Sequence, residues 1–173
     1  LQERMEYYKV PAVSVAVIDN MEIRWLAAYG VKQFGDSSKV TTNTLFQCAS
    51  VSKPVAGIGA MKLADEGVLA VDEEINRLFT RWQLPDAGYE VPVTIRRILS
   101  HTAGLGVGGF TGYFAGDSLP DVYQIIDGLP PANSPAVRLA AEPGTRFMYS
   151  GGGYQVMQAA MEEVTGKSFL EIM

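Results

Sequence analysis

Two adjacent segments near the start of the chain alternate apolar side chains and are joined by a short turn. Residues 12–18 have the sequence AVSVAVI and residues 21–30 the sequence MEIRWLAAYG, with Asp19 and Asn20 between them. Alternation with a period of two around a short polar turn predicts a β-hairpin. A lone hairpin is only marginally stable in water, and the second face of this one is also small and largely apolar. The two strands therefore predict a larger sheet covered by helices.

The rest of the chain favours helices, and no later segment has a strand pattern of equal quality. Apolar spacing and capping residues predict helices over residues 50–66, 72–77, 94–100, 121–127 and 152–164. Ser168 resembles a further N-cap, but only five residues follow it. The two strands have no further predicted strands to pair with, and the last predicted helix is little more than one turn long. We therefore expect this chain to be part of a larger fold.

The composition excludes several classes of function. The chain has 14 basic and 19 acidic residues, a net charge of -5, and no run of Lys or Arg that could neutralise phosphates. One Cys and one His cannot form an internal disulfide or a Cys/His zinc site. No apolar stretch approaches the roughly 20 residues that span a bilayer. We expect no nucleic-acid partner, no metal, no cofactor and no transmembrane segment, and the compartment (cytoplasmic, periplasmic or secreted) stays open.

A serine and a lysine three residues apart lie at the start of the helix predicted over residues 50–66. Positions i and i+3 share a helix face, so Lys53 can reach the oxygen of Ser50. A serine needs such a partner to become a nucleophile, and the positive end of a helix favours its alkoxide. An N-capping serine beside a solvated lysine explains the same pair without any chemistry, and spacing alone leaves both interpretations open.

Two other segments contain groups that could take part in catalysis. Tyr149 comes shortly before three glycines that let the backbone approach a ligand, and a tyrosine there can act as acid or base; a flexible helix entry with a core tyrosine is the alternative. His101 could pair with Ser50 or with the thiol of Cys48. A histidine at the end of a short helix can instead satisfy the last-turn carbonyls, which favours a structural role, and the apolar run around Cys48 favours burial.

Neither the dinucleotide-binding pattern nor the nucleophile-elbow pattern supports a function for this chain. Residues 104–109 match the dinucleotide pattern G-x-G-x-x-G, but a helix-like segment precedes them and the following residues cannot open a helix. No serine lies in the G-x-S-x-G pattern of nucleophile-elbow hydrolases. We therefore expect the glycine-rich residues 104–116 to form a loop.

Five strings, in this order, resemble the serine β-lactamase-like family, which includes class C β-lactamases, DD-peptidases, D-amino-acid peptidases and related esterases. They are VPAVSVAV (10–17), FQCASVSK (46–53), LSHTAGL (99–105), PGTRFMYS (143–150) and VTGKS (164–168). The resemblance implies an α+β, β-lactamase/transpeptidase-like fold, in which an antiparallel sheet packs against helices beside a helical domain. Residues 1–49 would supply the first strands and a connecting loop, and residues 50–173 the nucleophile helix and the helical domain.

The resemblance also implies an acyl-enzyme mechanism on a small ester, amide or peptide substrate. Ser50 would attack a carbonyl, Lys53 would help to deprotonate it, and Tyr149 would carry the proton to the leaving group. The family's third motif, Lys-Thr-Gly or His-x-Gly on a later strand, does not occur in these residues. We therefore expect a C-terminal fragment or a second chain to complete the fold, and the chain alone to be inactive.

One position departs from the family pattern. The family's second motif is commonly Tyr-x-Asn, whose Asn contacts the substrate amide, whereas this chain has Gly151 there. This argues against strong β-lactamase activity and leaves ester or D-amino-acid peptide hydrolysis. Gly151, Phe110 and Tyr113 are the candidate substrate-binding residues, although a surface loop with buried aromatic side chains explains the last two equally well. The alternative function is a non-catalytic or slowly acylating penicillin-binding or sensor relative that binds peptidoglycan-like ligands.

Overall fold

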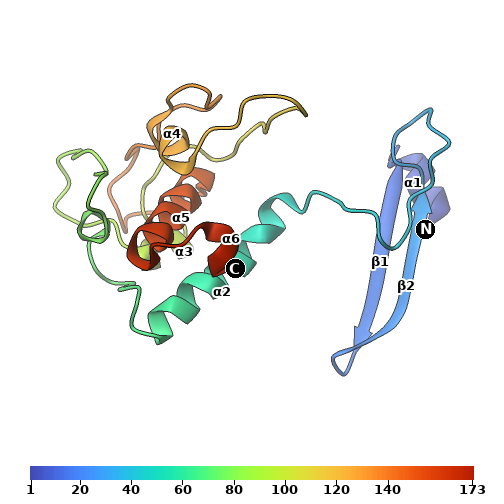
Figure 1. Cartoon of the computed structure of the whole chain (residues 1–173), viewed down its shortest axis with the longest axis horizontal. Coiled ribbons are helices and arrows are strands. Elements are labelled where there is room, and N and C mark those ends of the chain that lie inside the picture. The colour runs from blue at the N-terminus through green and yellow to red at the C-terminus, as the bar shows by residue number, and fades with distance from the viewer. The chain divides into compact units, whose positions relative to one another are not determined.

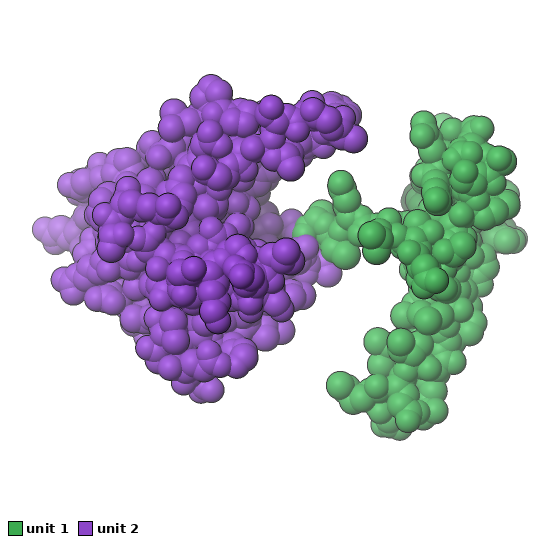
Figure 2. Space-filling model, viewed as in Figure 1, with its two compact units in different colours: residues 1–49 green, residues 50–173 purple.

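The computed structural model describes residues 1–173 and divides the chain into two compact units, residues 1–49 and 50–173 (Figure 2). The first unit contains all of the sheet, and the second contains almost all of the helices. None of these helices combines the length and the apolarity needed to cross a bilayer.

The first unit is a β-hairpin preceded by a short helix, α1 (Gln2–Tyr7) (Figure 1). Strands β1 (Ala12–Asp19) and β2 (Glu22–Gly30) pair antiparallel, which confirms the predicted hairpin. The two residues between the strands are Asn20 and Met21, both with positive φ, so the turn lies one residue later than the sequence predicts. Positive φ at both turn residues suits the right-handed twist of the flanking strands.

Both faces of this hairpin expose large apolar side chains. Val17 and Trp25 are cross-strand partners on one face, and Leu26 lies on the other. All three remain 45–48% exposed, and the sheet contains only these two strands. The hairpin thus buries little of its own apolar surface, which agrees with the expectation of a larger sheet.

The second unit consists of two longer helices, α2 and the buried α5, together with several short helices. Helix α2 begins two residues later than predicted, because Ser50 lies in the preceding 3-10 turn, and the helix predicted over residues 72–77 is a 3-10 turn shifted toward its C-terminal end. The elements are η1 (Ala49–Val51), α2 (Ser52–Asp65), η2 (Ile75–Leu78), α3 (Ile95–Leu99), α4 (Val122–Asp127), α5 (Gly151–Thr165) and α6 (Phe169–Ile172).

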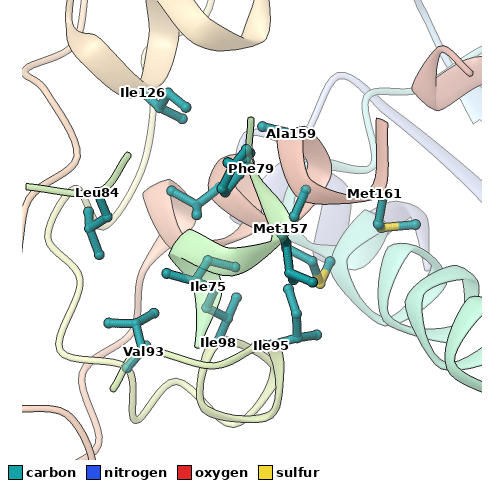
Figure 3. Close-up of a cluster of buried hydrophobic side chains, with 14 of the residues drawn as sticks. Ile75, Phe79, Leu84, Val93, Ile95, Ile98, Ile126, Met157, Ala159 and Met161 are labelled. Carbon is teal, nitrogen blue, oxygen red and sulfur yellow. The ribbon is translucent and has the colours of Figure 1, made fainter. Parts of the chain in front are cut away.

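Helix α5 is the centre of the second unit. It contacts α2, η2, α3, α4 and α6, and its buried residues include Met157 and Met161. Figure 3 shows these methionines among apolar side chains from η2 and α3, such as Ile75 and Ile98. Complete burial of one such side chain contributes about 1.5–3 kcal/mol. The core therefore fixes α5, and with it the residues that lead into its N-terminus.

A carboxylate near the C-terminal end of α5 joins two further segments, the residues after η2 and helix α4. Glu163 accepts hydrogen bonds from the backbone and hydroxyl of Thr80, from Arg81 Nε at 3.2 Å and from Tyr123 Oη at 2.8 Å. Its side chain is only 11% exposed. The bonds from Thr80 and Tyr123, together with the charge of Arg81, lower the pKa of Glu163 to about 2.

Candidate active site

Ser50 and Lys53 lie at the N-terminal end of α2. Ser50 is exposed in the turn η1, and Lys53 is half-buried in the first turn of the helix. Lys53 Nζ donates a hydrogen bond to Ser50 Oγ at 3.2 Å, so the spacing of three residues joins them although α2 begins after Ser50. Pro54 is accommodated because the first turn of a helix needs no N–H from it.

Tyr149 approaches the same oxygen from the segment that leads into α5. Its hydroxyl donates a hydrogen bond to Ser50 Oγ at 2.8 Å, across 99 residues of sequence. Lys53 Nζ lies 5.1 Å from the centre of the Tyr149 ring. The structure thus brings the three residues that the sequence analysis named as catalytic together around one hydroxyl, and Tyr149 is 42% exposed at this point.

The electrostatics of this trio favour negative charge on oxygen. The hydrogen bond with Ser50 lowers the pKa of Tyr149, and the hydrogen bond and charge of Lys53 lower it further. The N-terminal end of α2 adds a partial positive charge beside Ser50. The arrangement can therefore stabilise an alkoxide on Ser50 and accept or return a proton through Tyr149.

The backbone around Tyr149 is held by contacts that sequence reasoning missed. The N–H of Ser150 donates to His101 Nδ1 at 3.2 Å, and the N–H of Met148 donates to the carbonyl of His101 at 2.7 Å. Ser150 Oγ caps α5 by accepting from Gly153 N–H at 2.8 Å, and it donates to the carbonyl of Gly106 at 2.7 Å. Only the capping pattern of Ser150 was available as a sequence signal.

His101 acts through a different atom from the one expected. The last-turn carbonyls of α3 accept from backbone N–H groups, and the imidazole instead accepts from Ser150. The prediction that its ring satisfies the end of α3 is therefore wrong. Burial, and then the charge of Lys53, lower the pKa of His101, which favours the neutral ring that this hydrogen bond requires.

The three candidate substrate-binding residues lie in different surroundings. Gly151 is buried, and a Cβ added there would meet the carbonyl oxygen of Gly108 at 3.1 Å and the Phe110 ring at 3.3 Å. Phe110 thus packs over Gly151 while remaining 38% exposed. Tyr113 is half-buried and its hydroxyl accepts from the N–H of Asn133 at 3.2 Å, so it is engaged by the segment that follows α4.

The glycine-rich segment packs against the start of α5. The carbonyls of Val107 and Gly108 accept from the N–H groups of Gly152 and Gly151 at 2.9 and 3.2 Å. These amides are therefore used by the loop and not by a ligand.

No group of three or more His, Cys, Asp or Glu side chains is arranged to hold a metal ion. Cys48 is exposed, so its expected burial is wrong; the segment around it forms no regular structure and its neighbours are exposed as well.

Comparison with known proteins agrees with these features. The small antiparallel sheet and the helical unit are a partial domain of the β-lactamase/transpeptidase-like fold. The chain belongs to the Beta-lactamase family, whose family model matches residues 1–173.

Three similar proteins illustrate this family. Penicillin-binding protein 4 of Amycolatopsis lactamdurans is 30% identical over 168 residues, which cover 96% of this chain and 41% of that protein. EstCE1, described as a hydrolase with promiscuous acyltransferase activity, has a TM-score of 0.76 at 25% identity, covering 99% of this chain and 46% of that one. The D-amino acid amidase of Ochrobactrum anthropi SV3 also has a TM-score of 0.76 at 25% identity, covering 98% and 44%. This chain spans between about a third and two fifths of the curated relatives it matches.

Proposed function

We propose that this chain carries the reacting groups of a serine hydrolase that forms an acyl-enzyme on Ser50. The observation that supports this most directly is the convergence of Lys53 Nζ and Tyr149 Oη on Ser50 Oγ. A pure binding site has no need for a cation and a phenol on one serine hydroxyl, whereas a nucleophile needs both a proton acceptor and charge stabilisation.

The proposed reaction has two steps. The Ser50 proton passes to Lys53 in its neutral form, and Oγ forms a bond to the substrate carbonyl carbon as the carbonyl electron pair moves onto oxygen. Tyr149 then gives a proton to the leaving alkoxide or amine as its bond to carbon breaks. After each step Lys53 passes its proton to the Tyr149 phenolate, which restores both groups. In the second step a water molecule gives a proton to Lys53 as its oxygen bonds to the acyl carbon, and Ser50 Oγ leaves with a proton from Tyr149. The backbone N–H of Ser50 would supply one donor to the oxyanion.

We propose a small ester or a D-amino-acid peptide as the substrate. The likeness to a D-amino acid amidase supports a D-amino-acid acyl group, and the likeness to EstCE1, a hydrolase with promiscuous acyltransferase activity, supports acyl transfer. Gly151 argues against strong β-lactam hydrolysis, because it offers no side chain for a substrate amide and Phe110 packs against the space where one would begin.

The nucleophile is tested by intact-mass measurement after incubation with a fluorophosphonate. We expect one adduct on the wild type, none on Ser50→Ala, and an adduct of wild-type yield on Ser52→Ala, which removes an exposed hydroxyl two residues away. The measurement is made on this chain and on a version extended to the length of its relatives. Absence of an adduct on the extended protein would refute the hydrolase proposal.

A second candidate is a slowly acylating penicillin-binding or sensor protein that binds peptidoglycan-like ligands. The absence of a side chain at Gly151 favours it, and two similar proteins are named penicillin-binding proteins. The lifetime of the adduct formed with a fluorescent penicillin separates the two candidates. An adduct that persists for hours without ester turnover indicates a sensor, and rapid turnover of a nitrophenyl ester indicates a hydrolase.

We further propose that an additional polypeptide, a C-terminal segment or a second chain, completes the catalytic protein. Helix α2 leaves Val55, Ile58 and Met61 between 48% and 70% exposed, and the curated relatives are more than twice as long as this chain. We expect residues 1–173 alone to show no turnover of an ester that the extended protein hydrolyses. Full turnover by residues 1–173 would overturn this proposal.

A further inference from the structure

His101 is enclosed by the residues that lead into helix α5. Its ring centre lies 4.4 Å from that of Tyr149 and 5.4 Å from that of Tyr154, both tilted by 35°, and 5.7 Å from that of Phe147, edge to face. The ring therefore packs directly on the tyrosine whose hydroxyl reaches Ser50.

Two hydrogen bonds attach His101 to the residues on either side of Tyr149. Its carbonyl accepts from Met148 N–H, and its Nδ1 accepts from Ser150 N–H. Since Met148 and Ser150 flank Tyr149, these bonds fix the backbone on both sides of it. Ser150 is only 4% exposed, so water cannot readily replace the bond to its N–H if the imidazole withdraws.

The backbone of His101 is itself specialised. Its φ of 55° lies in the left-handed region, which disfavours most side chains but is tolerated by Asn, Asp and His. This conformation comes immediately after Ser100, the C-cap of α3 (Ile95–Leu99).

We propose that His101 is a positioning residue for Tyr149: as a neutral ring protonated on Nε2, it holds the segment 148–150 so that Tyr149 reaches Ser50, and protonation of Nδ1 at acid pH releases that hold. The inference rests on the proposed role of Tyr149 in the reaction. Protonation replaces an acceptor by a donor that points at the Ser150 N–H, and two donors cannot bond to each other.

The groups around the imidazole set the direction of this pH dependence. Lys53 from α2 is the charged group that faces it, and Tyr149 and Tyr154 are the titratable ones. Burial and the positive charge of Lys53 both disfavour a second cation, so the neutral ring persists to lower pH than in a free histidine. The hydrogen bond from Ser150 N–H to His101 Nδ1 is thus lost only on the acid side of the pH range.

A nuclear magnetic resonance experiment on residues 1–173 tests the hold without requiring catalysis. The chain contains one histidine, so its imidazole nitrogens give a single set of signals. At neutral pH we expect the Nε2–H tautomer, with the amide proton of Ser150 shifting in step with the His101 titration. The proposal would be overturned by the Nδ1–H tautomer, or by a Ser150 amide chemical shift that does not change as His101 titrates. Either result holds whether or not the protein is a hydrolase.

Two variants separate the hydrogen bond from the ring packing in the extended protein. His101→Asn tolerates the left-handed backbone and offers Oδ1 near the position of Nδ1, whereas His101→Phe keeps a ring and removes the acceptor. We expect the fluorophosphonate labelling rate to fall about tenfold in His101→Phe, as for a misplaced reacting group, and to stay within about threefold of wild type in His101→Asn.

The pH profile distinguishes positioning from simple structural damage. We expect His101→Asn to lose the part of the acid limb that follows the His101 titration in the wild type, since an amide does not titrate in this range. Thermal unfolding of each variant identifies any loss of folded protein. Equal labelling by both variants, or an unchanged acid limb in His101→Asn, would overturn the proposal, whereas a wild type that never labels contradicts the proposed function.

Discussion

At the scale of single residues, the proposed chemistry depends on the hydroxyl of Ser50. It accepts from an ammonium group at 3.2 Å and from a phenol at 2.8 Å. Hydrogen bonds of this kind strengthen as the acceptor gains negative charge, because the donor is charged or acidic. The same two donors influence each other, since the lysine charge favours the ionised form of Tyr149.

Removal of that charge has a measurable effect on Tyr149. In Lys53→Met we expect the pKa of Tyr149 to rise toward the usual tyrosine range, because the cation that favours its phenolate is lost. Titration of carbon-13-labelled tyrosine, with Tyr149→Phe to assign the signal, measures this change. Lys62→Met is the matched control, since Lys62 lies in the last turn of α2 and pairs with Glu66, the C-cap of that helix. An unchanged pKa in Lys53→Met would contradict the proposed coupling.

The contacts of Ser50 with Lys53 and with Tyr149 are not equally predictable from the sequence, and the reason is their separation along the chain. Ser50 and Lys53 are three positions apart, so local helical geometry predicts their contact. Tyr149 is 99 residues away from Ser50, and no local rule addresses such a contact; only the family resemblance suggested it. The bond from Ser150 to His101 spans 49 residues and was missed for the same reason.

At the scale of elements, helix α5 begins with three glycines that meet very different surroundings. A Cβ at Gly152 would lie 2.8 Å from the carbonyl oxygen of Gly106 and 2.8 Å from a methyl of Val137. A Cβ at Gly153 would meet nothing closer than Ser150 Oγ at 3.4 Å. The glycine at position 152 is therefore required by close packing, and the one at position 153 is not.

Alanine substitutions at Gly152 and Gly153 should differ in their effect on the free energy of unfolding. We expect Gly152→Ala to lower the free energy of unfolding by about 1–3 kcal/mol through overpacking against backbone and Val137. Gly153→Ala should be within about 1 kcal/mol of wild type, because alanine favours the helix over glycine by about that amount. Urea denaturation measures both values. A Gly152→Ala protein as stable as Gly153→Ala would show that the 105–108 loop can move away.

Capping residues made several elements predictable. Thr94 accepts from Arg97 N–H at the start of α3, as the sequence predicts, and Asp121, predicted as the first residue of its helix, accepts from Gln124 N–H as the N-cap of α4. The start of α2 was less predictable, because Ser50 lies in a 3-10 turn whose first residue, Ala49, has a φ of 43°. Nothing in local propensity predicts a left-handed alanine.

At the scale of the whole molecule, the two units differ in how they are stabilised. The buried cluster consists of residues from the second unit, whereas the first unit buries one large apolar side chain, Val40. The hairpin was predictable from alternation, but the burial of Val137 was not. Val137 is fully buried in a segment without regular structure, because its N–H bonds to the carbonyl of Ile126 and α5 packs on its side chain.

The cluster around Glu163 makes the stability of the second unit depend on pH. Its pKa is about 2 in the folded chain against a usual 4.5, so the stabilisation is complete above pH 4.5 and is lost as the pH falls from 4.5 toward 2. We expect Glu163→Gln to be less stable at neutral pH and to show a weaker loss of stability over this acid range. Denaturation curves at several pH values measure this difference.

A surface glutamate serves as the control for this prediction. Glu90 is exposed in the segment between η2 and α3, and we expect Glu90→Gln to retain the acid slope of the wild type. If Glu163→Gln kept the full acid slope, the pH dependence would have to come from other carboxylates.

The long separation between Ser50 and Tyr149 has a consequence for folding. Closing a loop of 99 residues costs chain entropy before any contact compensates for it, so we expect this contact to form only with the packing of α5. Locally formed helices in an otherwise unfolded chain would bring Lys53 to Ser50 but leave the serine without its phenol. Reactivity at Ser50 during refolding would then follow the arrival of the native topology and not the earlier gain of helix.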